Sequence, residues 1–306
     1  MTSSKSSCHP LRAAGWLIVF TLLIVNAASA TYPGQNGRIA FVAHFTGTWQ
    51  LYSVKPDGSD LFQITNLPPT EFPFWFPDYS PDGKQLVFCH DMSGAVELYT
   101  INTDGSGLTQ VTHDEAENIF PRWSPDGTHI LFSTLFNGDF GYHHLATIRA
   151  DGSERTVLTS VLFDDYQAEY TVDGRHILFG STTDNLISAI WTIDANGKHK
   201  KRITRPALKA SGPDVSPDGQ HMVFYDHQNT DVIGETWVGR TDGTQLRKVT
   251  RNLGAGNPSF APDGSKIVFN DRSGNLLTMN ADGSDVQTIL SCAEGCALPD
   301  WGAKAP

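Results

Sequence analysis

The stretch FPRWSPDGTHILFS, residues 120–133, decides the fold. Its centre is the tripeptide Pro125-Asp126-Gly127, and an apolar segment lies on each side of that tripeptide. Proline fixes φ, aspartate hydrogen-bonds to its own backbone and glycine accepts a positive φ, so the tripeptide favours a tight turn. The stretch therefore predicts two short β-strands joined by that turn.

The same pattern occurs four more times along the chain. The other copies are PDYSPDGKQLVF (77–88), AEYTVDGRHILF (168–179), PDVSPDGQHMVF (213–224) and PSFAPDGSKIVF (258–269). Their turn aspartates, Asp82, Asp126, Asp173, Asp218 and Asp263, are 44, 47, 45 and 45 residues apart. A period of this length indicates an array of equivalent supersecondary units.

Each repeat also contains a second turn, of Asp-Gly or Asn-Gly type, before a short segment that ends in threonine in every repeat except the last, where Ile289-Leu290 stands instead. In one repeat these are Asp151-Gly152 and Val157-Leu158-Thr159. Two hairpin turns in each repeat predict four antiparallel strands, which is typical of a β-propeller blade. We expect the turn aspartates to have a structural role.

The two ends of the chain supply complementary parts of one further blade. Residues 38–41, 51–54 and 62–65 give three strands without an innermost strand, and residues 299–302 give an innermost strand alone. We therefore predict an all-β, six-bladed antiparallel propeller, closed by N- and C-terminal strands in one composite blade. Closure removes the exposed edges of an open sheet array.

The N-terminal residues 1–30 have the features of a secretory signal peptide. Lys5 and Arg12 precede an apolar run at residues 15–25, and Ala28-Ser29-Ala30 forms a small-residue cleavage site. The run falls short of the ~20 residues that a membrane-spanning helix needs. We predict a single propeller domain at 31–306, periplasmic or secreted, without a membrane span after cleavage.

The charge limits the possible partners. The formal net charge is −11, and removing the two cations of the signal peptide leaves −13. Nucleic-acid binding depends on clustered Lys and Arg, so this acidity argues against a nucleic-acid partner. A cationic partner fits better, and we expect a monomer.

The units P-x-W-S-P-D-G-x-x-I-x-F and I-x-x-x-x-D-G resemble the WD40-like PD40 repeats of TolB-type propellers, over residues 37–301. The resemblance implies a non-catalytic scaffold that binds a protein or peptide in the cell envelope. Oligogalacturonate lyases share similar propellers, so the alternative is a metal-dependent carbohydrate-active enzyme such as a polysaccharide lyase. Enzymatic activity is left open.

A column of residues precedes the aromatic position of each innermost strand. The column consists of Asp78, Arg122, Glu169, Asp214, Ser259 and Asp300. Because these strands surround the central channel, four acids in the column predict a cation-attracting channel mouth. It would bind a divalent cation such as Ca²⁺, or Lys and Arg side chains of a partner. The alternative is a solvated channel in which water and Arg122 screen the acids.

The face opposite the Asp-Gly turns should carry longer loops, and loops on a rigid scaffold often bind ligands. Its candidate binding residues are Phe74, Trp75, His90, His113, Glu117, Asp165, Tyr166 and His227. The alternative for the aromatic segment 72–76 is that it packs against the neighbouring blade or covers the channel mouth. A lyase would require two or more of His44, His90, His113 and His227 to meet a carboxylate in one pocket.

Three cysteines follow the signal peptide. Cys292 and Cys296 are candidates for a disulfide in an exported protein. Cys89 lies in an apolar segment, where we expect a buried free thiol.

Overall fold

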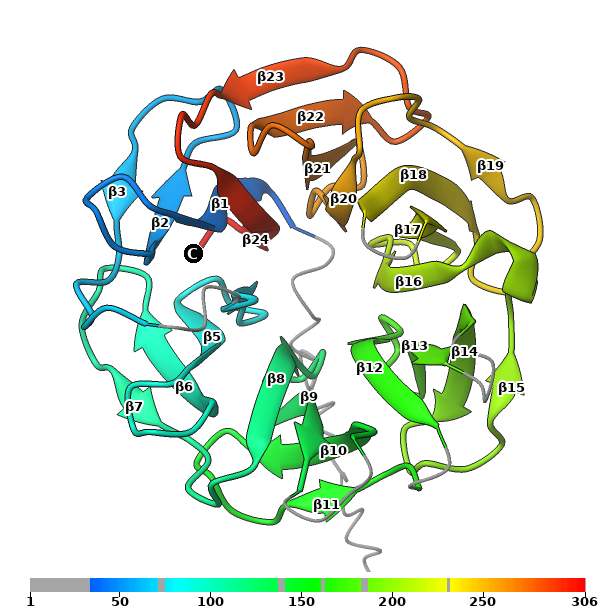
Figure 1. Ribbon diagram of the computed structural model, residues 1–306, viewed down its shortest axis with the longest axis horizontal. Helices are drawn as coiled ribbons and strands as arrows, with labels where there is room; N and C mark the ends of the chain where they lie inside the picture. Colours follow the sequence, from blue (N-terminus) through cyan, green and yellow to red (C-terminus); the bar gives the residue numbers. More distant parts are fainter. Residues whose placement is uncertain are drawn as a thin grey trace, which may run out of the picture.

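Six four-stranded antiparallel sheets form a closed ring around a central axis (Figure 1). The computed structural model describes residues 34–70, 75–136, 141–160, 163–182, 187–229 and 232–305. Within these ranges the only helix is the short 3₁₀ segment η1 (Pro206–Leu208). The predicted six-bladed β-propeller is confirmed.

Each blade runs from an innermost strand at the axis to an outer strand at the rim. Blade I consists of β24 (Cys296–Ala303), β1 (Asn36–Ala43), β2 (Gln50–Val54) and β3 (Phe62–Gln63). Blade II consists of β4 (Asp78–Tyr79), β5 (Gln85–His90), β6 (Glu97–Asn102) and β7 (Thr109–Gln110). Blade III consists of β8 (Glu117–Trp123), β9 (His129–Leu135), β10 (His144–Arg149) and β11 (Thr156–Val157). Blade IV consists of β12 (Asp164–Tyr170), β13 (His176–Thr182), β14 (Ser188–Asp194) and β15 (Lys201–Arg202). Blade V consists of β16 (Ala210–Val215), β17 (His221–Asn229), β18 (Val232–Arg240) and β19 (Arg247–Lys248). Blade VI consists of β20 (Gly256–Phe260), β21 (Lys266–Asn270), β22 (Leu276–Asn280) and β23 (Gln287–Leu290).

Blade I joins the two ends of the chain. Its innermost strand β24 pairs antiparallel with β1, with Trp301 opposite Ile39 and Asp300 opposite Ala40. In Figure 1 the red β24 lies directly beside the blue β1. The composite closing blade therefore has the strands that the sequence predicts.

The phenylalanine that ends each repeated pattern forms the centre of its blade. The six residues, Phe41, Phe88, Phe132, Phe179, Phe224 and Phe269, are all 0% exposed. Each lies on the second strand of its blade, so its side chain packs between blades rather than toward solvent. Burying a side chain of this size contributes roughly 1.5–3 kcal/mol.

The threonine at the end of each outer segment bonds back to the third strand. Its hydroxyl accepts a hydrogen bond from a backbone N–H fourteen residues earlier, over 2.8–3.0 Å. The five pairs are Thr65 with Leu51, Thr112 with Leu98, Thr159 with Leu145, Thr204 with Ile190 and Thr250 with Thr236. The repeated threonine thus fixes the outer strand, whose own ladder is only two residues long in these blades.

The turn residues have the structural role expected of them. Asp151 Oδ1 accepts hydrogen bonds from the backbone N–H and the hydroxyl of Ser153, and those bonds lower the pKa of Asp151. Gly152 has φ +83°, and a Cβ on it would lie 2.8 Å from the carbonyl oxygen of Val111 in the preceding blade. Glycine is therefore needed both for the turn and for the contact between blades.

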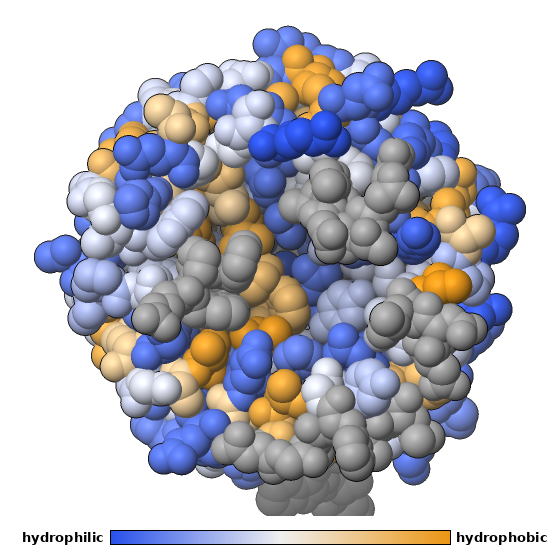
Figure 2. Space-filling view, in the orientation of Figure 1, coloured by the Kyte–Doolittle hydropathy of each residue, from blue (hydrophilic) through white to orange (hydrophobic). Residues whose placement is uncertain are grey.

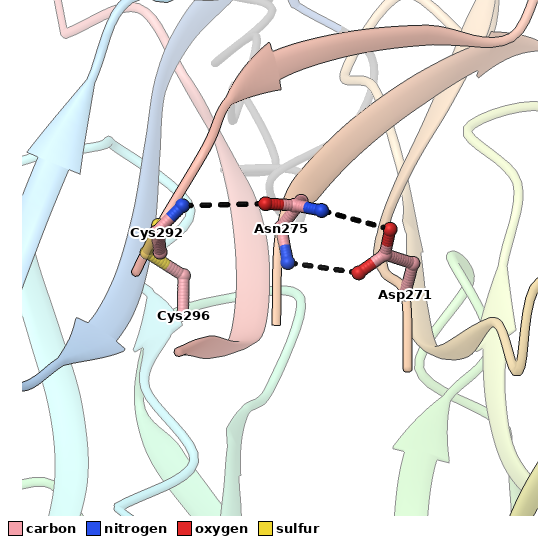
Figure 3. The surroundings of a disulfide bond; sticks show 4 residues. All are labelled: Asp271, Asn275, Cys292 and Cys296. Atoms are coloured by element: carbon pink, nitrogen blue, oxygen red, sulfur yellow. Dashed lines mark hydrogen bonds between the residues drawn. A yellow bond between two sulfur atoms is a disulfide. The ribbon is translucent and has the colours of Figure 1, made fainter. Parts of the chain in front are cut away.

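A disulfide lies where blade VI leads into the closing strand (Figure 3). Cys292 and Cys296 are joined, with their Cα atoms 5.7 Å apart. The backbone N–H of Cys292 donates to Asn275 Oδ1, and the Asn275 side chain donates to Asp271 Oδ2. Cys89 is buried and is not part of a disulfide, and its Sγ lies 3.4 Å from the Trp75 carbonyl oxygen. The disulfide therefore closes the short loop before β24, and hydrogen bonds from the Cys292 and Cys296 amides, to Asn275 Oδ1 and the Gly274 carbonyl oxygen, hold this loop against blade VI.

No helix in the described ranges is both long enough and apolar enough to cross a membrane.

Replacing Thr112 by valine should lower the free energy of unfolding by about 1–3 kcal/mol, because the buried Leu98 N–H loses its acceptor. Thr112→Ser keeps the hydroxyl and should retain most of the stability. Thr109→Val, on the exposed outer strand, is the control. Chemical denaturation measures all three, and a Thr112→Val protein as stable as wild type would contradict the role of this threonine.

Removing the disulfide with Cys292→Ala and Cys296→Ala should cost about 2 kcal/mol of stability, since the closed loop is short. Intact-mass measurement of the denatured wild-type protein should show two more alkylated cysteines when the protein is reduced before alkylation than when it is not. Equal stability of the oxidised protein and the double variant would show that the disulfide does not stabilise the loop before β24.

Candidate functional site

Six residues with left-handed backbone surround one mouth of the central channel. These residues, here called the mouth ring, are Phe76 (φ 45°), Phe120 (φ 55°), Gln167 (φ 49°), Gly212 (φ 58°), Asn257 (φ 49°) and Leu298 (φ 57°). Each stands two positions before a column residue, and in blades III to VI the strand register shifts at that point. A bulge of this kind turns a side chain in a new direction, here toward the axis.

The mouth ring encloses a small cavity that all six of its residues line. The cavity also contacts Arg122 and Tyr225, and has room for roughly 30 Å³ of solvent. That volume holds about one or two water-sized groups. Figure 2 shows the corresponding hollow at the centre of this face, apolar toward blades II and III and hydrophilic toward blades IV and V.

The two sides of the mouth differ in chemistry. On the apolar side the rings of Phe76 and Phe120 have centroids 4.2 Å apart. On the polar side Gln167 Oε1 accepts a hydrogen bond of 3.0 Å from the Tyr225 hydroxyl. A Cβ on Gly212 would lie 2.4 Å from Tyr225 Cε1, so glycine leaves the space that the tyrosine ring fills. The mouth can therefore contact an apolar group and an amide at once.

Below the mouth, most column side chains bond to the next blade. In each case the acceptor takes a hydrogen bond from the backbone N–H of the aromatic residue in the following innermost strand. The pairs are Asp78 with Trp123 (2.7 Å), Asp214 with Phe260 (2.7 Å), Ser259 with Trp301 (3.4 Å) and Asp300 with Tyr79 (2.9 Å). These bonds join four consecutive junctions, from blade V through blades VI, I and II to blade III.

Arg122 interrupts this series because a guanidinium cannot accept a hydrogen bond. The N–H of Tyr170, which would be its partner, instead donates to Glu169 Oε1 over 3.1 Å. Arg122 Nε lies 3.1 Å from Glu169 Oε2 and 3.8 Å from Asp78 Oδ1. An ion pair therefore replaces the hydrogen bond between blades III and IV.

The column contains four carboxyl groups and one guanidinium, and its aspartates are buried. Asp78, Asp214 and Asp300 are only 6–7% exposed. Burial, and then repulsion from Asp300, holds the pKa of Asp78 well above its usual value. Burial also raises the pKa of Glu169 and of Asp300, and Arg122 opposes both shifts. The raised pKa values favour the neutral form of these acids. None of the acids lines the mouth cavity, whose only lining residue from the column is Arg122.

Two residues predicted for the exposed loop face are buried. Trp75 and His90 are each 0% exposed, and their rings have centroids 4.5 Å apart. His90 Nδ1 accepts a hydrogen bond from the Met92 N–H, and burial lowers the pKa of His90. Trp75 stacks against Phe88 in the core of blade II, which agrees with the packing alternative for this segment, whereas the prediction of an exposed His90 was wrong.

Three more predicted loop residues lie in innermost strands. Glu117 begins β8, and Asp165 and Tyr166 lie in β12, because these strands continue past the bulge. Asp165 is buried, and both of its carboxylate oxygens accept hydrogen bonds from Lys200 Nζ, over 2.8 and 2.9 Å. The Tyr166 hydroxyl is 3.1 Å from Ser211 Oγ. Asp165 and Tyr166 therefore stabilise the blades.

The candidate histidines have separate surroundings. His113 is exposed between β7 and β8, and His227 lies in β17 with Nε2 3.1 Å from Ser211 Oγ. His44 Nδ1 pairs with Glu294 over 2.7 Å. None of these histidines lines the mouth cavity. Phe74 lies outside the described residues.

No group of three or more His, Cys, Asp or Glu side chains is arranged to hold a metal ion, as far as the described ranges extend. The predicted divalent cation at the channel mouth therefore has no assembled ligand set to support it there.

The mouth ring itself was not predicted from sequence. Its members are aromatic, amide, aliphatic and glycine residues, so they share no residue type. The available signal was positional: five of the six precede a proline, Pro77, Pro121, Pro213, Pro258 or Pro299. Proline cannot donate to a strand ladder, and it marks bulges.

The column makes stability depend on pH. A raised pKa means that the folded state binds more protons than the unfolded state between the two pKa values, so stability falls as pH rises through that window. Asp78→Asn keeps an acceptor for Trp123 and removes one charge, so its loss of stability between about pH 5 and about pH 8 should be smaller than that of wild type.

Asp78→Ala provides the matched comparison. It leaves the Trp123 N–H without an acceptor and should cost about 1–3 kcal/mol at either pH. Denaturant titrations at the two pH values measure both variants. The same pH dependence in wild type and Asp78→Asn would show that the column does not carry this linkage.

Comparison with known proteins places this geometry in a family. The model of the TolB β-propeller domain, PD40, matches residues 18–213 and 137–305. TolB from Acinetobacter baumannii is 22% identical, with a TM-score of 0.74 over 88% of this chain and 67% of that chain. A TolB-type structure from Agrobacterium tumefaciens is also 22% identical, with a TM-score of 0.63 over 83% and 88%.

A third similar structure comes from an enzyme. Oligogalacturonate lyase from Vibrio parahaemolyticus is 14% identical, with a TM-score of 0.50 over 79% of this chain and 87% of that chain. At these identities the structures show a shared fold. No curated protein sequence matched the chain. Because the family model matches nearly the whole chain, the chain belongs to the TolB β-propeller family.

Proposed function

We propose that this chain is a non-catalytic binding module whose mouth ring receives a protein or peptide partner. The observation that carries the proposal is the convergence of six left-handed residues, one from each blade, around a single cavity. Left-handed non-glycine residues cost about 1–3 kcal/mol each and tend to cluster at ligand sites. Five of the six mouth-ring residues are not glycine, so this geometry is maintained against a local cost.

The cavity limits what the partner inserts. With room for roughly 30 Å³ it accepts the tip of one side chain, while the rest of the partner lies across the rim. Phe76 and Phe120 provide an apolar contact, and Gln167 and Asn257 provide amide hydrogen bonds. The partner we propose is an extended polypeptide segment with an apolar anchor, because its backbone offers the matching donors and acceptors.

The charge beneath the mouth acts at longer range. Four carboxyl groups and one guanidinium lie in the column. We propose that the mouth keeps a net negative potential, although burial raises the pKa of Asp78, Glu169 and Asp300. Such a field raises the rate at which a cationic segment arrives more than it raises affinity. We therefore propose a partner with Lys or Arg beside its apolar anchor. A Ca²⁺ ion at this position stays a prediction.

The proposed location is the cell envelope or outside the cell. The N-terminal residues predict export, the disulfide suits an oxidising compartment, and TolB proteins are among the similar structures. The lyase alternative has no comparable support, because the histidines it needs bind different partners in separate blades.

The test replaces Phe120 by asparagine. Asparagine tolerates positive φ and occupies the same position as Asn257 in blade VI, so the backbone should be preserved. Phe120 also packs against the core between blades II and III, so chemical denaturation must first show that the variant is folded. In affinity capture from an envelope extract, retention of the partner should fall at least about tenfold, equivalent to about 1.4 kcal/mol.

Leu61→Asn is the control, because Leu61 is an exposed leucine on the outer rim, 47% accessible. It should retain the partner as wild type does. Retention by Phe120→Asn equal to that of wild type, or no protein retained by any of the three, would reject the mouth ring as a protein-binding site.

A further inference from the structure

A basic segment lies on the outer rim of this acidic protein. Residues 195–213 contain six Lys or Arg residues and no Asp or Glu, although the whole chain has a net charge of −11. The segment includes the outer strand β15 of blade IV and the connection to blade V. The basic residues are therefore concentrated on one side of the ring.

The outer strand of the next blade continues the basic surface. β15 is Lys201–Arg202 and β19 is Arg247–Lys248, and the two strands are neighbours on the rim (Figure 1). The outer strands β3, β7, β11 and β23 contain no Lys or Arg. Lys on edge strands can serve to prevent aggregation. The four other outer strands of the ring are edges too, yet they contain no lysine. Protection of strand edges therefore does not explain why Lys and Arg are concentrated on blades IV and V.

The exposed cations of this surface have few contacts with acidic residues, although Arg247 donates a hydrogen bond to the Asp282 carbonyl oxygen and helps to lower the pKa of Asp282. Within the described ranges, none of them forms an ion pair with an acidic side chain. They are Lys198, Lys201, Arg202, Arg205, Arg247 and Arg251, here called the rim patch. The nearby buried acids pair with other lysines: Asp165 with Lys200, and Asp226 with Lys248.

Asp194, an acidic residue at the end of the neighbouring strand β14, already pairs with a histidine. Asp194 Oδ2 lies 2.6 Å from His199 Nδ1. The acidic column lies at the ring axis and the rim patch lies at its circumference (Figure 1). Charges further apart than the Debye length of ~8 Å are largely screened at physiological salt. The local positive charge, rather than the net charge, therefore decides what binds here.

Aromatic side chains accompany the cations. The Arg202 guanidinium lies over the ring of Trp191, 5.8 Å from its centroid, and Trp191 is only half-buried. Phe163 is also partly exposed, with Lys200 Nζ 4.8 Å from its ring centroid. Amphipathic aromatics beside basic side chains are typical of surfaces that meet lipid headgroups.

We propose that the rim patch binds an anionic lipid surface. Its cations lie on the outermost strands β15 and β19 and in the turns and connections beside them. They form a convex edge that a plane of headgroup phosphates can contact without a groove. An acidic peptide would instead pair along a strand edge, and β15 and β19 each offer only two residues. In this orientation the propeller contacts the lipid surface with its circumference, so the mouth ring on its face stays accessible to a partner.

The test is co-sedimentation with vesicles at about 0.1 M salt. One set contains equal parts of phosphatidylglycerol and phosphatidylcholine, and the other contains phosphatidylcholine alone. The protein should sediment with the first set only. In the variant Lys198→Gln, Lys201→Gln, Arg202→Gln and Arg205→Gln, binding should fall by roughly 100-fold or more, since each cation near an anionic surface contributes about fivefold.

The control variant makes the same change in net charge elsewhere: Lys55→Gln, Lys84→Gln, Arg149→Gln and Lys304→Gln. It should bind the anionic vesicles within about threefold of wild type, and thermal unfolding checks that both variants are folded. No binding to anionic vesicles, or an equal loss in both variants, would overturn the proposal. Binding of polyglutamate without binding of vesicles would also overturn it, and would assign the patch to an acidic polypeptide.

Discussion

The hydrogen bond between a column side chain and the backbone N–H of the next innermost strand holds the blades in a ring. It joins strands of different sheets, so it forms only when two blades meet. Asp78, Asp214, Ser259 and Asp300 make this bond at four consecutive junctions. Burying carboxylates for this purpose raises their pKa, and the single guanidinium of Arg122 offsets part of the repulsion. The acids at the axis thus have a structural reason to be there, and the mouth ring, where we propose that the partner binds, lies above them.

Much of the fold could be predicted from the sequence because its signals are local and repeated. The Pro-Asp-Gly turns, the buried phenylalanine and the terminal threonine each act within one blade. The number of times that this pattern recurs, together with the two incomplete repeats at the ends, gives the number of blades. The composite blade followed from the incomplete repeats at the two ends. The site was harder to predict, because burial depends on segments that are far away in the sequence. Trp75 and His90 looked like exposed loop residues, yet each packs inside blade II. The mouth-ring residues share a backbone angle rather than a residue type, so no pattern of letters identifies them.

The ring separates two surfaces of opposite character. The mouth, at the axis, combines apolar and amide groups and lies above four buried or half-buried acids and one arginine. The rim patch, at the circumference of blades IV and V, is positive and convex. A propeller is rigid, so a partner at the mouth and a surface at the rim can be engaged at once without competing. This arrangement suits a scaffold, whose role is to hold other components at fixed positions.

The most direct test of the column's role is native-state hydrogen exchange of the Tyr79, Trp123 and Phe260 amides, with and without Ca²⁺. If the column closes the ring, these three amides should exchange only through global unfolding, with one common free energy and no response to Ca²⁺. Fast exchange of any of them through local opening, or a change in protection on adding Ca²⁺, would show instead that the column is an open ligand surface.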